Sequence, residues 1–393
     1  MAFSPTPKQA RRAFPWCKAG LWHKVGLSSM AGAALLLVGC QTGPRGPAMP
    51  GPIEPPIQPI DVERNMVAVI VPLTGGDGPV GTSIANAAKL ALADTGDKSL
   101  RITVYDSAAP GGAAEATQRA ITEGNRLILG PLLAEDVRAA APVARRAGVP
   151  VIAFSNDDGV AGNGVFILGF TPAQSIGRVV AHARSKGAAR FAAMVPTGLY
   201  GQRAAQAMFG AVRKAGGQMA VVQTFDRSPQ AAVAAARRLN AKGGFDAVLI
   251  GDSGRMAATA APALKLGPRL LGTELWAADR ALGRTAALRG GWYAAAPNTQ
   301  FDRLTVRYRA RYGKTPYRLA SLGYDAVLLA VRSSRGWPLG HAFPARSLIA
   351  KDGFSGVDGN FRFGRDGVAE RLLEVRQVTA AGTTTVSPAA SAF

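Results

Sequence analysis

Glycines with the spacing of a phosphate-binding loop follow the first apolar run of the sequence. Residues 76–81, GDGPVG, fit the pattern G-x-G-x-x-G, and Asp106 ends the next apolar run. In a dinucleotide-binding fold, such a loop turns directly off its strand, and N–H groups at the helix start hold the pyrophosphate. Here residues 72–75 lengthen the loop, and Pro79 lacks an N–H group. We therefore interpret the segment as a glycine loop over a cleft and not as a nucleotide site.

Other side chains capable of chemistry do not form a catalytic set. The histidines are widely separated in the sequence, at His23, His182 and His341. No G-x-S-x-G or H-E-x-x-H pattern occurs, and the two acidic pairs, 135–136 and 157–158, fall at loops or expected helix starts. Carboxylates at helix starts usually complement the helix dipole. We therefore expect a protein that is not an enzyme and that uses no metal ion or cofactor.

The body of the sequence alternates between two kinds of segment. Apolar, β-branched runs predict buried parallel strands at residues 66–71, 100–105, 126–130, 150–154, 190–195, 219–225, 246–250 and 268–272. Alanine-rich segments between most of them predict helices at residues 82–94, 113–123, 134–147, 173–186, 200–215, 229–241 and 254–265. The pair Ser228-Pro229 is typical of a helix start. The alternation predicts an α/β fold with two doubly wound lobes.

Composition narrows the class of protein further. Hydrophobic residues make up 48% of the 393 residues and charged residues 18%, which favours a large core and argues against a disordered or coiled-coil chain. The net charge is +21. The first 39 residues hold five of the 46 basic residues and no acid, so 41 basic residues still outnumber the 25 acids. Apart from the doublets at 145–146 and 237–238, the basic residues of the body are spread singly, and they form no nucleic-acid module, so we expect no nucleic-acid partner.

The amino terminus has the pattern of a lipoprotein signal. A basic segment precedes the apolar run 25–39, which is too short to span a membrane, and LLLVGC ends at Cys40. This tail resembles a bacterial lipobox, in which the cysteine is lipidated and becomes the first mature residue. Gln41 then favours the periplasmic face of the outer membrane, with inner-membrane anchoring as the alternative. Residues 40–63 are rich in Pro and Gly and predict an extended tether after a signal peptide at 1–39.

The order of elements and their loop residues resembles the type 1 periplasmic-binding-protein superfamily, in its Leu/Ile/Val-binding branch. The matching segments span the body: 67–94, 102–107, 127–137, 147–157, 196–217, 245–252, 272–277 and 354–367. The resemblance implies two α/β lobes that are joined by a three-segment hinge and enclose a ligand cleft. It implies that residues 64–174 and 300–340 form the first lobe. Residues 175–299 and 341–386 then form the second, and 387–393 form a tail.

The resemblance also implies candidate residues for the cleft. By position, Tyr200 matches an aromatic residue that closes over the ligand, and Glu274 an acid that holds its ammonium group. Ser155 and Asp157 lie on the loop after the fourth strand, and Ser253 lies on a loop of the second lobe. Where amino-acid binders offer a hydroxyl, residues 134–136 are Ala-Glu-Asp, and two acids would repel a carboxylate. This departure argues against binding of an α-amino acid in the usual pose.

Two functions are left open by the sequence. Residues 130–137, 152–157 and 167–174 look most like lipoproteins that activate penicillin-binding protein synthases of peptidoglycan, and this is the first interpretation. Its partner is such a synthase, reached by the tether from a lipid anchor in the membrane. The alternative is a Leu/Ile/Val-type solute-binding protein for an amino acid or amide. Its partners are a small polar solute and an ABC permease.

Overall fold

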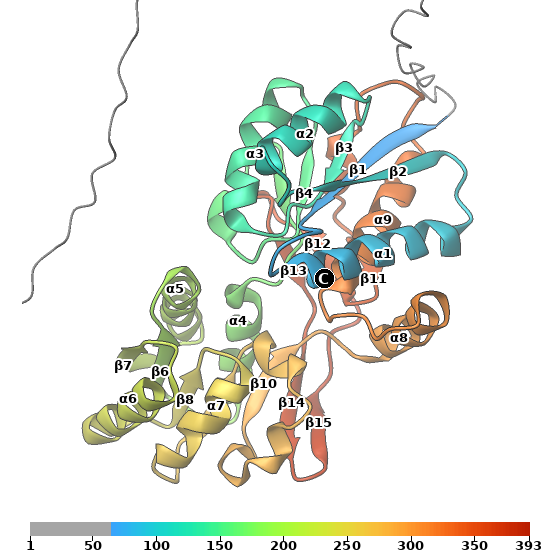
Figure 1. Ribbon diagram of the computed structural model, residues 1–393. Coiled ribbons are helices and arrows are strands. Elements are labelled where there is room, and N and C mark those ends of the chain that lie inside the picture. The colour runs from blue at the N-terminus through green and yellow to red at the C-terminus, as the bar shows by residue number, and fades with distance from the viewer. Residues whose placement is uncertain (1–63) are drawn as a thin grey trace, which may run out of the picture. The chain divides into compact units, whose positions relative to one another are not determined.

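The computed structural model describes residues 64–393 (Figure 1). The signal peptide, Cys40 and the tether therefore lie outside the described residues. Within residues 64–393, no helix has the length and apolar character needed to cross a membrane. The same range contains no group of three or more His, Cys, Asp or Glu side chains arranged to hold a metal ion.

The first lobe is built on a parallel sheet with the strand order β2-β1-β3-β4-β5. Its strands are β1 (Asn65–Val71), β2 (Leu100–Asp106), β3 (Leu127–Leu129), β4 (Val151–Ala153) and β5 (Val165–Ile167). Val, Ile and Leu dominate β1, β3 and β4 because both faces of the sheet are covered by helices. Strand β5 was not predicted; it pairs in parallel with β4 at the edge of the sheet.

Helices cover both faces of this sheet. They are α1 (Gly78–Thr95), α2 (Gly112–Thr122), α3 (Ala134–Arg146), α8 (Thr299–Tyr312) and α9 (Ala320–Ser334). Side chains from α8 and α9, among them Leu304 and Leu329, lie in the same core cluster as Val69 of β1. These helices come from the end of the chain, yet they pack beside α1, as Figure 1 shows. Gly323 of α9 permits a close approach to α1, because a Cβ at this position would lie 2.4 Å from the carbonyl oxygen of Ile84.

The second lobe is built on a seven-stranded sheet with the order β15-β14-β10-β9-β8-β6-β7. Its strands are β6 (Arg190–Pro196), β7 (Gln218–Phe225), β8 (Ala247–Ile250), β9 (Arg269–Gly272), β10 (Trp292–Ala295), β14 (Glu374–Thr379) and β15 (Gly382–Ser387). The first five pair in parallel, whereas β14 and β15 join antiparallel at the edge. The expected α/β fold with two doubly wound lobes is thus confirmed.

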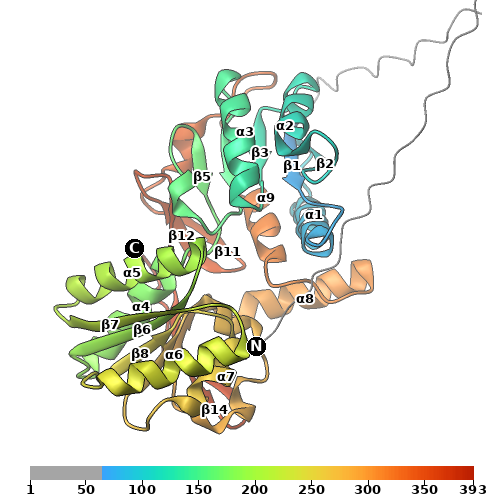
Figure 2. The same cartoon turned by 60° about the vertical axis from the view of Figure 1, so that its left-hand side comes forward.

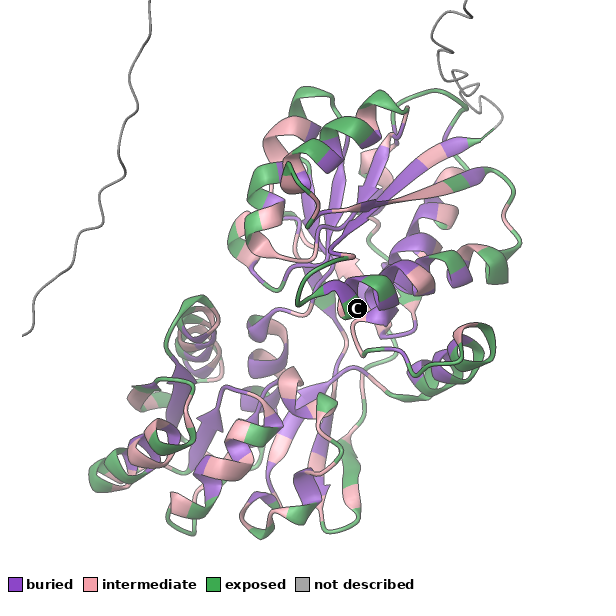
Figure 3. Ribbon diagram, in the orientation of Figure 1, coloured by how far each residue is buried: buried purple, intermediate pink, exposed green. Residues whose placement is uncertain are grey.

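The helices of the second lobe are α4 (Pro172–Ser185), α5 (Leu199–Lys214), α6 (Pro229–Lys242) and α7 (Gly254–Ala260). Capping residues explain where two of these helices begin. Ser228 caps α6, where its Oγ accepts a hydrogen bond of 3.2 Å from the N–H of Ala231, as the Ser-Pro pair predicted. Thr171 and Gln174 form a capping box at α4. Figure 3 shows buried strands between helices whose outer faces are exposed.

A small antiparallel sheet requires a correction to the expected lobes. Its strands are β11 (Phe354–Gly356), β12 (Gly359–Phe363) and β13 (Ala369–Arg371). Phe354, Phe361 and Phe363 are buried in the core of the first lobe, and the preceding residues Phe343 and Leu348 join them. The segment up to Arg371 therefore belongs to the first lobe and not to the second, because its aromatic side chains are buried there. Only β14 and β15 return to the second lobe.

Three stretches of chain connect the lobes. They lie between β5 and α4, between β10 and α8, and between β13 and β14. Figure 2 shows these connections where the two lobes meet. The carboxyl ends of the parallel strands of both lobes point toward this junction, so loops from both sheets converge there.

Candidate functional site

A cavity of about 460 Å³ lies between the two lobes. Its first-lobe wall comes from loops that follow β1, β3 and β4, together with residues just before α9. Its second-lobe wall comes from the short 3-10 helix Glu274–Ala278 after β9 and from the end of β10. Parallel α/β sheets place ligands at this carboxyl edge, where the strand order reverses and the loops diverge. The volume is within the range of small-molecule sites.

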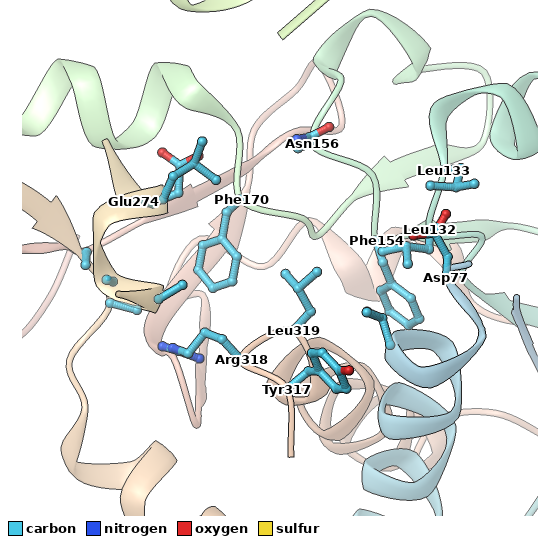
Figure 4. Close-up of a pocket in the computed structure, with 16 residues that line it drawn as sticks. Asp77, Leu132, Leu133, Phe154, Asn156, Phe170, Glu274, Tyr317, Arg318 and Leu319 are labelled. Carbon is cyan, nitrogen blue, oxygen red and sulfur yellow. The ribbon is translucent and has the colours of Figure 1, made fainter. Parts of the chain in front are cut away.

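The lining is predominantly apolar (Figure 4). The lining residues with apolar side chains are Val80, Leu132, Leu133, Phe154, Phe170, Leu275, Ala277, Ala278, Ala295, Ala296 and Leu319. The remaining five bring polar groups: Asp77, Asn156, Glu274, Tyr317 and Arg318. An apolar surface with a few polar groups is the usual composition of a site that binds a small organic molecule.

Glu274 is the predicted site residue that lines the cavity. It follows Thr273 directly after β9, so the end of a buried strand presents its carboxyl group at the junction of the lobes. Its Oε2 accepts a hydrogen bond from the Ser175 hydroxyl, and its Oε1 accepts one of 3.1 Å from the Tyr200 hydroxyl. Burial raises the pKa of Glu274. The carboxyl group is thus held in one orientation by second-lobe side chains while it faces the cavity.

Tyr200 lies behind Glu274 and does not line the cavity. Its hydroxyl is 3.1 Å from both Glu274 Oε1 and Thr273 Oγ1. Burial, followed by the nearby charge of Glu274, raises the pKa of Tyr200 well above the ordinary value. The resemblance implied that the Tyr200 ring closes over a ligand. In the structure the ring lies outside the cavity lining, and its hydroxyl group positions Glu274.

Ser155 and Asp157 also lie away from the cavity lining. Ser155 is buried, and its Oγ accepts a hydrogen bond of 3.1 Å from the Asp157 N–H. Asp157 is buried between two arginines: Arg138 of the first lobe and Arg203 of the second, whose Nε is 2.9 Å from its Oδ1. Asp157 therefore connects the lobes by an ion pair. The intervening Asn156 and the preceding Phe154 are the residues of this loop that face the cavity.

Ser253 caps a helix and does not line the cavity. Its Oγ accepts a hydrogen bond of 3.3 Å from the N–H of Met256 at the start of α7. The glycine loop 75–78 is held by Asp106, whose Oδ1 accepts a hydrogen bond of 2.8 Å from the Leu73 N–H. Burial alone would raise the pKa of Asp106, but the donors around it outweigh burial and lower the pKa. The loop thus has a structural anchor, and its Asp77 lines the cavity together with Val80 of α1.

Sequence reasoning missed the aromatic walls of the cavity and Arg318. Phe170 lies on the first connection between the lobes, and Tyr317 and Arg318 lie just before α9. Only Phe170 falls within a motif that the resemblance used. Nothing local in the sequence marks Tyr317 and Arg318, because their proximity depends on α9 packing beside α1.

Four charged side chains are packed together behind this wall. Arg318 forms an ion pair with Asp358, which is fully buried, at 2.5 Å between Nη1 and Oδ1. Asp325 of α9 accepts hydrogen bonds from the N–H groups of Val357 and Asp358. Arg371 is also buried, and its Nη2 donates to the carbonyl oxygen of Leu168 at the first connection. This buried cluster, Arg318, Asp325, Asp358 and Arg371, ties α9 to two of the connections between the lobes.

The buried cluster predicts a pH-dependent stability. Burial and the charge of Asp358 raise the pKa of Asp325 to about 7, from an ordinary value of 3.8. Between these values the folded protein holds a proton that the unfolded chain releases, so stability falls as the pH rises. We expect the urea midpoint of Asp325→Asn to change less between about pH 5 and pH 8 than that of the wild type. Asp302→Asn, at an exposed acid on α8, should leave the wild-type pH dependence unchanged.

If Asp325→Asn retains the full pH dependence of the wild type, the decrease in stability with rising pH does not come from the Asp325 carboxyl group. The difference between the urea midpoints at pH 5 and pH 8 is taken within each variant. Any effect of the substitution on stability that is the same at both pH values therefore cancels.

A family model described as periplasmic binding protein matches residues 66–383 of this chain. This chain belongs to that family. The match covers both lobes and all three connections between them, so the family assignment rests on the whole described fold. It is consistent with a cavity at the junction of the lobes.

Solved structures share the fold at low sequence identity. A leucine binding protein, LivK, from Thermotoga maritima is 22% identical, with a TM-score of 0.63 over 82% of this chain and 98% of that one. A solute binding protein of an ABC transporter from Rhodopseudomonas palustris, in complex with 3,4-dihydroxybenzoic acid, is 21% identical, with a TM-score of 0.64 over 84% and 97%. LivJ from Streptococcus pneumoniae, with isoleucine, is 18% identical, with a TM-score of 0.62 over 83% and 100%.

One curated relative also matches. An uncharacterized protein of Rickettsia prowazekii is 22% identical over 174 residues, which are 44% of this chain and 47% of that protein. This chain therefore spans about half the length of the curated relative it matches. The three solved structures are all less than 25% identical to this chain, and they show that it shares their fold.

Proposed function

We propose that this protein is the solute-binding component of an ABC-type importer. The observation that carries the proposal is the 460 Å³ cavity, which is lined by both lobes at the carboxyl edges of their sheets. A ligand in this position contacts both lobes at once, so its binding favours the arrangement in which they enclose it. The structural relatives that transport leucine-type amino acids or bind aromatic acids support this assignment.

The proposal has a direct test. A thermal-shift screen of amino acids, amides, amines and aromatic acids is expected to find at least one stabilising solute. A ligand at 100 times its Kd stabilises the folded protein by about 2.7 kcal/mol. The same ligand should lose this effect when Phe170→Asp places a charge in the apolar wall, whereas Tyr105→Phe, at a buried ring away from the cavity, should retain it. A screen in which no solute stabilises the protein contradicts the proposal.

A second candidate function is activation of a peptidoglycan synthase. The lipobox-like LLLVGC, Gln41 and the Pro-rich segment 41–63 support this function, since together they suit a protein that reaches a partner from a membrane anchor. Its test is a pull-down of penicillin-binding protein synthases with the full chain, followed by a glycan-polymerisation assay. Capture of a synthase and a faster rate support it, and the absence of both contradicts it.

Both functions share a proposed lipid anchor on Cys40 at the periplasmic face of the outer membrane. Cys40→Ser is expected to move the protein from the membrane fraction to the soluble fraction, and to abolish the mass added by the lipid. Cys17→Ser removes the other cysteine and should change neither result. Membrane association that persists in Cys40→Ser contradicts the lipid anchor.

A further inference from the structure

Acidic residues line the cavity from both lobes. Glu274 lies on the second-lobe wall and Asp77 on the first-lobe wall, with the aromatic rings between them in Figure 4. Asp136 and Glu135 lie near Asp77 on the first-lobe side. Burial first, and then the charges of Glu135 and Asp77, raise the pKa of Asp136. An anion that entered the cavity would therefore meet negative charge on both sides.

The positive charge in the lining is already compensated. Among the lining residues, all of which are described, Arg318 is the only cation. It forms its ion pair with the fully buried Asp358, and its Nη1 also donates a hydrogen bond of 2.9 Å to Ser321 Oγ. A ligand carboxylate would have to compete with Asp358, whose own charge would then be buried without compensation.

The neutral donors that could hold a carboxylate are few. Ser155 is only 1% exposed, and the loop after β3 presents Leu133 and Ala134, which carry no hydroxyl group. Asn156 and Tyr317 line the cavity and can each donate hydrogen bonds, but neither carries a positive charge. A carboxylate that leaves water for an apolar cavity needs more compensation than this.

The cavity is better suited to a ligand that donates hydrogen bonds than to one that accepts them. Both oxygens of Glu274 are fixed by hydroxyl donors, Ser175 and Tyr200, and each carboxylate oxygen can accept a further hydrogen bond. The rings of Phe154, Phe170 and Tyr317 supply apolar surface between the two carboxyl groups. Aromatic faces also attract an organic cation.

We propose that the cavity binds an organic ammonium ion with an apolar body and no carboxylate, and that Glu274 accepts the hydrogen bonds of its N–H groups. This inference rests on the proposed solute-binding function and narrows its ligand class. The acidic residues on both walls, the ion-paired Arg318 and the small number of neutral side-chain donors all select against an amino acid or an aromatic acid.

Calorimetric titration of the full chain with three matched probes tests the ligand class. 2-Phenylethylamine carries only the ammonium group, 3-phenylpropionate only the carboxylate, and L-phenylalanine both. The amine is expected to bind at least tenfold more tightly than either of the others. Binding of 3-phenylpropionate or phenylalanine with equal or higher affinity overturns the inference but leaves the solute-binding function standing. Failure of the amine to bind also overturns the inference, whereas failure of the whole solute screen overturns the function.

A variant tests the role of Glu274. Glu274→Gln keeps the size of the side chain and an acceptor for Tyr200 but removes the charge, so affinity for the amine should fall at least tenfold. Glu115→Gln makes the same change at an exposed acid on α2 and should leave affinity unchanged. Equal affinities in the two variants overturn the role of Glu274.

A second variant covers the case in which Glu274→Gln does not fold. The side chain of Asp77 makes no capping hydrogen bond to α1, so Asp77→Asn should fold normally. It should weaken binding of the amine several-fold and leave binding of a neutral amide, 3-phenylpropanamide, unchanged. An equal change for both probes overturns the electrostatic part of the inference.

Discussion

Asp358→Ala is expected to lower the free energy of unfolding by about 3–5 kcal/mol, because it breaks the buried ion pair with Arg318 and leaves Asp325 as the one acid of the buried cluster beside two arginines. Asp358 is fully buried in the turn between β11 and β12, and its carboxylate lies against Arg318. Arg371 is buried beside the first connection between the lobes, where its Nη2 is bonded to the Leu168 carbonyl oxygen. Urea denaturation followed by tryptophan fluorescence measures the loss.

The neighbouring sheet provides a matched control. Arg362 of β12 and Glu370 of β13 form an ion pair of 2.7 Å between Nε and Oε2, with side chains 37% and 53% exposed. An exposed pair of this kind contributes about 0–1 kcal/mol, so Glu370→Ala should cost little. Similar losses in the two variants would show that burial is not what makes the Arg318–Asp358 pair important. Asp358→Asn, with its shape retained, should also be destabilised if charge compensation is the cause.

Gly201→Ala is expected to lower the free energy of unfolding by about 1–3 kcal/mol, through overpacking at the start of α5. An added Cβ would lie 1.6 Å from the carbonyl oxygen of Pro196, which is backbone and cannot rotate away. The helix would have to move off the end of β6, and α5 carries Tyr200 and Arg203. The variant is therefore expected to lose ligand affinity as well as stability.

The same helix contains its own control. A Cβ added at Gly210 meets no atom within 4 Å. Because alanine is a better helix former than glycine, Gly210→Ala should stabilise the protein by about 0.5–1 kcal/mol. Thermal and urea unfolding of both variants give the comparison. A neutral effect of Gly201→Ala would mean that α5 can shift without cost and that the contact with Pro196 does not hold it.

The predicted strands and helices correspond to observed ones because their sequence signals are local. Val and Ile runs of four to seven residues mark β1 and β8, and Ser228-Pro229 marks the start of α6. Strand β5 has only three residues, and its strand conformation depends on pairing with β4. The assignment of β11 to β13 to the second lobe was wrong for a related reason. An alternating apolar pattern shows that a strand has a buried face, but it does not show which core buries it.

In the candidate site, too, the sequence pattern does not show where each single side chain lies. Glu274 could be anticipated because the family resemblance places an acid at this position, two residues after the end of β9. Ser155 and Asn156 are adjacent on one loop, yet Ser155 turns into the protein and Asn156 into the cavity. That difference depends on the hydrogen bond from the Asp157 N–H to Ser155 Oγ and on the arginines around Asp157. These contacts come from other elements, so a pattern of residue types along one segment cannot predict them.

The sequence by itself determined the alternating α/β elements, the two-lobed class and the absence of a recognisable catalytic set. These follow from hydrophobic periodicity, helix capping and residue spacing, which act within about ten residues along the chain. Only the tertiary structure decided which lobe receives β11 to β13, which side chains line the cavity, and that Arg318 is neutralised by Asp358, 40 residues away. The charge that a ligand meets depends on such long-range pairs, because a buried ion pair cancels a charge that the sequence shows as free.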